Sequence, residues 1–133
     1  MTVGISTVNL ANAWLNMIKA TAFTAPAATW VELHTADPGS AGTTSVSAGS
    51  TTRLQAVSAT WTNAASGSLV YSTTIGPWTN GGTSETISHI AVFSASSAGT
   101  FWFSAALTTP QAWASGNTFS LNTLSVSMSP LAA

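Results

Sequence analysis

Apolar side chains recur at every second position in short segments over most of this chain, and turn sequences separate the segments. The alternation covers residues 29–35, 55–61, 69–75 and 101–107. A period of two is typical of β-strands with one buried face. Together with turns every ~8–12 residues, it predicts a mainly β fold in one domain spanning residues 1–133. We expect an antiparallel β-sandwich, of jelly-roll or immunoglobulin-like type, with about six to eight short strands.

Three features refine this prediction. Residues 87–93 are apolar on both faces, which is typical of a central strand. Near the end of the chain, apolar residues occupy odd positions in 119–121 but even positions in 124–128. This change of parity at residues 122–123 predicts a bulge, or a strand that changes sheets. The Gly-Pro pair at 76–77 is expected to end the strand before it.

The first segment has the period of a helix. Its apolar residues follow the i, i+4, i+7, i+8 spacing of one helix face, at Leu10, Trp14, Met17 and Ile18. The sequence therefore predicts one N-terminal α-helix at about residues 6–20. This apolar stripe either packs on its own domain or docks on a neighbouring subunit, and the sequence leaves both possibilities open.

A turn and a long loop follow the first predicted strand. Asp37-Pro38-Gly39 predicts a structural turn, because Asp can bond the backbone ahead, Pro presets φ and Gly tolerates positive φ. Residues 40–52 are mostly small, with only Val46 as a packing anchor. A loop of this length is unusual in a compact domain, so we expect it to be flexible.

The chain has only two cations and three acids, and this scarcity excludes several classes of protein. Lys19 and Arg53 are too few to form a nucleic-acid-binding stripe. Ser and Thr make up 42 of the 133 residues, and the net charge is −1. Such a low net charge favours association, so we expect an assembled protein. Only Arg53 and Glu85 could guard sheet edges, so loops, the helix or neighbouring subunits must cover those edges.

Other compositional features restrict the chain further. It has no Cys, which excludes disulfide bonds and thiolate metal sites. The segment before Lys19 lacks the basic start of a signal peptide, and none is expected. No apolar run approaches about 18 residues, so no membrane span is expected.

The residues that carry acid–base or metal chemistry are few. His34, His89 and Asp37 could hold zinc only if the strands brought them together, and nothing would be left to orient the imidazoles. We therefore expect each His to be hydrogen bonded within the fold, and predict no metal, cofactor or catalytic residue. Glycan hydrolysis would need a carboxylate pair from Glu32, Asp37 and Glu85, so an enzyme is the last-ranked function.

The six Trp residues offer candidate contacts. Trp14 lies on the helix stripe, Trp78 follows a Gly-Pro turn, and Trp102 stands alone on one face of its strand. Trp is enriched at interface hot spots. We therefore take Trp14, Trp78 and Trp102 as candidate interface residues, with burial in the core as the alternative.

Residues 33–39 read Leu-His-Thr-Ala-Asp-Pro-Gly, and this heptapeptide resembles a motif of small bacteriophage virion proteins described as tail-fibre or decoration proteins. The resemblance extends through Arg53, residues 87–90 and the turn at 99–100 to residues 114–119. It implies a β-sandwich that follows a short helix, and a structural role in the virion.

Two non-enzymatic functions fit this resemblance. The favoured one is a capsid decoration (cement) protein, a homotrimer that binds the outer surface of the major capsid protein and stabilises the assembled shell by mass action. The alternative is a tail-fibre or tail-tip module for host attachment, with loop 40–50 and Trp30 or Trp78 as its recognition surface. Its partners would be tail proteins or a host surface ligand. Neither nucleic acid nor a membrane is an expected partner.

Overall fold

The computed structural model describes residues 3–129, so the predicted domain 1–133 extends at both ends beyond the described residues. A π-helical turn at Thr7–Ala11 leads into α1 at Asn12–Met17, and a 3-10 turn lies at Ser58–Thr60. The described strands are β1 (Thr29–His34), β2 (Leu54–Ala56), β3 (Ser68–Tyr71), β4 (Ile75–Thr79), β5 (Glu85–Phe93), β6 (Phe101–Trp113), β7 (Thr118–Leu121) and β8 (Leu124–Ser127).

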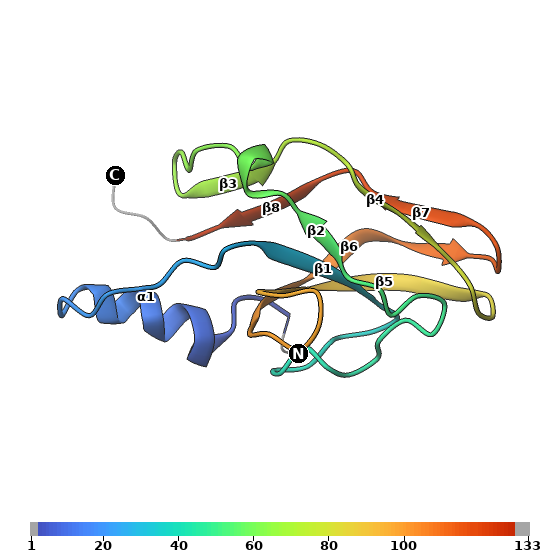
Figure 1. Ribbon diagram of the computed structural model, residues 1–133, viewed down its shortest axis with the longest axis horizontal. Helices are drawn as coiled ribbons and strands as arrows, with labels where there is room; N and C mark the ends of the chain where they lie inside the picture. The colour runs from blue at the N-terminus through green and yellow to red at the C-terminus, as the bar shows by residue number, and fades with distance from the viewer. Residues whose placement is uncertain (1–2, 130–133) are drawn as a thin grey trace.

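The strands form two layers that enclose one core (Figure 1). One layer is a four-stranded antiparallel sheet in the order β2-β1-β5-β6. The other layer is built from two antiparallel pairs, β3 with β8 and β4 with β7. The protein is therefore mainly β, with a sandwich-like arrangement of antiparallel strands and an N-terminal helix, which confirms the predicted fold class.

Alternating residues of both layers fill the core. Val31 and Leu33 of β1 and Ile87 of β5 are completely buried, because these strands have neighbours on both sides within the sheet. From the opposite layer, Trp78 enters the core with 2 % of its surface exposed. Its indole Nε1 donates a hydrogen bond to the Thr52 carbonyl at 2.8 Å. Burial of these apolar surfaces is the main force that holds the layers together.

The change of parity near the end of the chain coincides with a change of strand partner. Residues 122–123 separate β7, which pairs with β4, from β8, which pairs with β3, so the predicted change of sheet is confirmed. The Gly-Pro pair at 76–77 lies within β4, where its peptide bond is cis and the register shifts between Ile75 and Trp78. The predicted end of the strand was wrong, because an irregular part of a strand tolerates a Pro that donates no ladder hydrogen bond.

The predicted strand 55–61 is a strand only in its first part. β2 ends at Ala56, the 3-10 turn follows, and Trp61 then bridges to Tyr71 in the other layer. The chain crosses between the layers here, and the Trp61 and Tyr71 rings pack edge-on with centroids 5.3 Å apart. Apolar side chains alternate both before and after this crossing, so the period of two alone did not reveal where the chain changes layers.

The edge of β6 is protected without charged side chains. Residues 4–6 run beside its first half, where the Ser6 N–H donates to the Trp102 carbonyl at 2.7 Å. In its second half, residues 107–110 have no paired position in β5, and Pro110 lies in this irregular stretch. Covering segments, bulges and Pro all discourage pairing with another chain. The expected cover for this edge is thus supplied in part by the chain itself.

The N-terminal helix and its return segment, residues 7–28, form an arm that projects beyond one end of the sandwich (Figure 1). The Ser6 hydroxyl caps its first turn. Leu10 is buried against the sandwich, but Met17 is 55 % exposed and Ile18 is 86 % exposed. The apolar stripe therefore packs on its own domain only toward its N-terminal end, because the helix runs past the sheets (Figure 1). Within residues 3–129, no helix has the length and apolarity to cross a membrane.

Candidate functional site

The largest cluster of charged side chains is held inside the fold. The Arg53 Nε lies 3.3 Å from Oε1 of Glu32, and its Cζ lies 3.4 Å from the centre of the Phe93 ring. The same guanidinium donates to the carbonyls of Ala95 and Ala98, in the turn between β5 and β6. Arg53 therefore fastens this turn to β1 and does not guard a sheet edge.

His34 completes this buried cluster. Its Nδ1 lies 2.8 Å from the Thr44 carbonyl, and its Nε2 lies 3.5 Å from Oε2 of Glu32. Burial alone would raise the pKa of Glu32, but the His34 ring beside its carboxylate, the hydrogen bond from Arg53 and the charge of Arg53 hold this pKa below its ordinary value of 4.5. The ionised Glu32 carboxylate is thus engaged from within the fold, which favours a structural role.

Glu85 anchors the loop at residues 40–52. Its carboxylate accepts hydrogen bonds from the Ser47 hydroxyl and from the N–H groups of Ala48 and Gly49, the latter two at 3.1 Å. Ser47 is completely buried. Within the loop the sequence offers only Val46 as an anchor, and no local pattern reveals this carboxylate, because Glu85 is far away along the chain. The flexibility of this loop stays a prediction, and the hydrogen bonds to the Glu85 carboxylate are expected to restrict its motion.

Asp37, Pro38 and Gly39 lie where the chain leaves β1. Gly39 has a φ of +76°, and its N–H donates to Oδ1 of Asp37 at 2.9 Å. Pro38 is buried, and its carbonyl accepts from the Thr44 N–H at 3.0 Å. The Asp37 carboxylate is therefore turned toward the backbone of its own turn.

The two His residues do not form the zinc arrangement that the sequence raised. Strand register places His34 directly opposite His89, so the required strand neighbourhood exists. However, both ring nitrogens of His34 face groups of the buried cluster, and His89 Nδ1 lies 2.7 Å from the Ser88 hydroxyl. Among the described residues, no three potential metal ligands come together.

The three candidate interface Trp residues lie in two environments. Trp78 is a core residue, so its predicted contact role does not fit the structure. The register shift in β4 and the hydrogen bond to Thr52 hold its ring between the layers. Trp14 and Trp102 are only partly buried, and both line the same apolar pocket. Trp30 of β1 is partly exposed and does not line this pocket.

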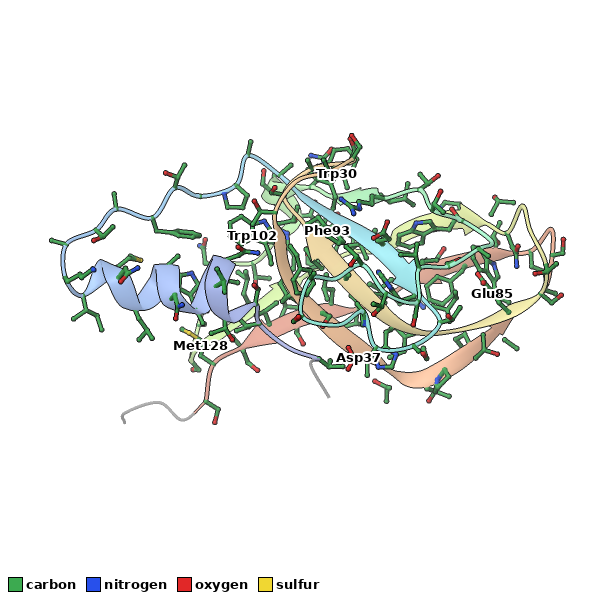
Figure 2. The ribbon with its side chains drawn as sticks, turned by 90° about the horizontal axis from the view of Figure 1, so that it is seen from below. Trp30, Asp37, Glu85, Phe93, Trp102 and Met128 are labelled. Atoms are coloured by element: carbon green, nitrogen blue, oxygen red, sulfur yellow. The ribbon has the colours of Figure 1, made fainter. Side chains whose placement is uncertain are left out.

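This arm pocket, as we call it, has a volume of about 440 Å³ and lies between the arm and the β3–β8 end of the sandwich. Figure 2 shows Trp102 and Met128 beside the root of the arm helix. The Trp102 ring packs edge-on against Phe23 with centroids 6.0 Å apart, and its buried Nε1 has no acceptor among the described residues. The pocket walls are mainly apolar and include Leu10, Trp14, Phe23, Trp61, Trp102 and Met128.

A second hollow, the open groove, has a volume of about 700 Å³ and lies between β6 and the β7–β8 segment. Its lining includes no charged residue and is rich in hydroxyl and amide groups. No local sequence pattern predicts this groove, because the closeness of β6 to β7 and β8 follows only from the stacking of the layers. The available signal was Thr108-Thr109-Pro110, which interrupts the apolar alternation of the strand. Its polar lining includes Thr108, Thr109, Gln111, Asn122 and Thr123.

Comparison with known proteins identifies one family. Residues 4–129 match the family described as Gp80, podophage GP4 fiber I protein gp80. No curated protein matches the chain. The family match covers the arm, both layers and both hollows. It supports the resemblance to phage tail-fibre-type proteins but does not test the heptapeptide at residues 33–39 on its own.

Proposed function

Because the chain belongs to the Gp80 family of podophage fiber proteins, we propose that it is a non-enzymatic structural module of a phage tail fibre that takes part in host attachment. The family match carries this proposal. It favours the tail-fibre alternative over capsid decoration, the function favoured from the sequence, which gains no support from the match. The proposed location is the tail of the virion, and the proposed partners are tail proteins and a host surface ligand.

The placement of the carboxylates supports a function without catalysis. Glu32 is paired with Arg53, Asp37 accepts from its own turn, and Glu85 accepts from the loop at 40–52. Glycoside hydrolysis generally needs two carboxylates that face one bond of the substrate from opposite sides. Here each carboxylate is bonded within a different part of the fold, so binding is the better-supported mode of action.

We assign ligand recognition to the open groove. Its hydroxyl and amide groups can donate and accept hydrogen bonds, and no charge lines it. Convergent polar groups in a concave site are typical of ligand binding, and the chemistry suits an uncharged polar polymer such as a neutral host polysaccharide. Of the recognition surface expected at loop 40–50 with Trp30 or Trp78, Trp78 is buried and Trp30 is partly exposed. The convergent polar lining of the groove is the reason for proposing the groove in its place.

Particles with and without this protein provide the test of location and role. We expect an antibody against the chain to label the tail in electron micrographs. Particles that lack the protein should adsorb poorly to host cells but should retain the heat resistance of their capsid. Label over the whole capsid surface, together with loss of heat resistance and normal adsorption, would instead establish capsid decoration.

A substitution in the open groove tests the assignment of the ligand surface. The purified protein should compete with particles for host cells, and Thr109→Lys should abolish this competition by placing a charged side chain in the groove. Thr109 is exposed, so the variant should fold normally. Thr51→Lys is the matched control, since Thr51 is exposed and lies outside both hollows. Equal competition by both variants would exclude the groove as the recognition surface.

A further inference from the structure

The apolar surface of the arm helix is only partly covered by its own domain. Leu10 and Trp14 line the arm pocket. The exposed apolar side chains of the arm, which we call the arm ridge, are Val8, Leu15 and Ile18, exposed by 76 %, 64 % and 86 %. Asn side chains recur at i, i+3 and i+7 on the remaining side, so the helix is amphipathic, with an apolar stripe wider than its own domain covers. The arm ridge therefore indicates that another surface covers the arm in the assembled protein.

The arm ridge and the arm pocket match in chemistry, yet they do not meet within one molecule. Leu10 and Trp14 of the same helix already form one wall of the pocket, and no residue of the ridge lines it. The pocket volume of about 440 Å³ is roughly three times the ~150 Å³ that holds benzene in an engineered apolar cavity. It therefore has room for two aliphatic side chains, such as Leu15 and Ile18, from a second molecule.

The distribution of charge favours a second copy of this chain over a charged partner. Lys19 is the only charged residue in the arm, and none lines the arm pocket. With a net charge of −1, copies repel each other little.

We propose that copies of this chain associate head to tail, with the arm ridge of one copy seated in the arm pocket of the next. The two surfaces of this contact differ, so the interface is heterologous and builds either a closed ring or an open filament. The contact uses Trp14 and Trp102, two of the three Trp residues that the sequence marked as interface candidates. The proposal concerns contact between copies and holds whether or not the protein binds a host ligand.

Self-association of the full chain is the first test. Light scattering and sedimentation over a range of concentrations should show oligomers of the wild type. Leu15→Ser with Ile18→Ser should weaken association by about tenfold or more for each side chain, because both leave the apolar contact. Ala64→Glu should weaken it similarly, since Ala64 is exposed and lines the pocket. Val57→Ser is the matched control, an exposed apolar residue outside both surfaces.

Mixing the two defective proteins tests the head-to-tail geometry. The ridge variant keeps an intact pocket and the Ala64→Glu variant keeps an intact ridge. An equal mixture should therefore form pairs that contain one copy of each and that grow no further. Circular dichroism and urea unfolding confirm that each variant is folded. A monomeric wild type, a ridge variant that associates like the wild type, or a mixture that remains monomeric would overturn the proposal.

Discussion

Leu33 in the sandwich and Met17 in the arm both lie at regularly spaced apolar positions, yet Leu33 is completely buried and Met17 is 55 % exposed. The difference lies in what faces each side chain. β1 has a strand on either side and a second layer above it, whereas the arm helix extends past the end of both layers (Figure 1). Periodicity therefore identifies an apolar face, but a distant part of the chain, or another chain, decides whether that face is buried.

The largest expected effect lies at the centre of the sandwich. Trp78→Ala should lower the free energy of unfolding by about 3–5 kcal/mol, because it removes a buried aromatic side chain and leaves a cavity. Leu15→Ala in the arm is the control and should change it by less than about 0.5 kcal/mol. Urea unfolding of both variants measures the contrast. Similar losses in the two variants would mean that the arm is part of the cooperative core.

The next effect concerns the buried ion pair and depends on pH. Glu32→Gln should lower stability by about 2 kcal/mol near neutral pH, because the carboxylate bonds a charged guanidinium. The folded-state pKa of Glu32 is lowered, so its contribution is complete above the ordinary value of 4.5 and is lost as the pH falls through the folded-state pKa. Denaturant unfolding of the wild type and the variant from neutral to acid pH should show their stabilities converge. A difference in stability between the wild type and the variant that grows toward acid pH would contradict a stabilising Glu32–Arg53 ion pair.

A smaller and more local effect is expected at the loop at residues 40–52. Glu85→Ala removes the acceptor for the Ala48 and Gly49 N–H groups and should destabilise the protein by about 1–2 kcal/mol. Hydrogen exchange should speed up at these two amides while the amides of β5 that pair with β1 stay protected. Unchanged exchange at Ala48 and Gly49 would show that the rest of the loop holds itself in place.

The smallest effect on folding is expected at the arm ridge. Leu15→Ser combined with Ile18→Ser should leave the stability of the dilute monomer within about 0.5 kcal/mol of the wild type, because both side chains are exposed. At higher protein concentration, association should stabilise the wild type but not the variant. Thermal unfolding across a dilution series would detect this. A large loss in the dilute monomer would place the ridge in the core of a single chain.

Local patterns predicted much of the fold. The central strand at residues 87–93 lies within β5, and the change of parity at 122–123 marks the boundary between β7 and β8. Strand period and turn chemistry depend on neighbours a few residues apart, so they can be read without the tertiary structure. The predicted strand at 55–61 was partly wrong, because the crossing between layers after Ala56 depends on Trp61 reaching Tyr71.

The candidate site was less predictable. Trp14, Trp78 and Trp102 all qualified by residue type, but only Trp14 and Trp102 meet at the arm pocket. Phe23 and Met128 also line that pocket and come from opposite ends of the chain. Their closeness follows from the position of the arm beside β8, which no local pattern encodes.

The amino-acid sequence by itself determined that this protein is a sparsely charged β-sandwich with one N-terminal helix, because strand period, helix period and charge are properties of neighbouring residues and of composition. Only the tertiary structure decided which of its few charged side chains are paired and which of its aromatic side chains are buried. It placed Glu32 and Arg53 in a buried pair, put Trp78 in the core, and left Ile18 exposed. The physical reason is that burial and hydrogen bonding depend on which distant segments come into contact.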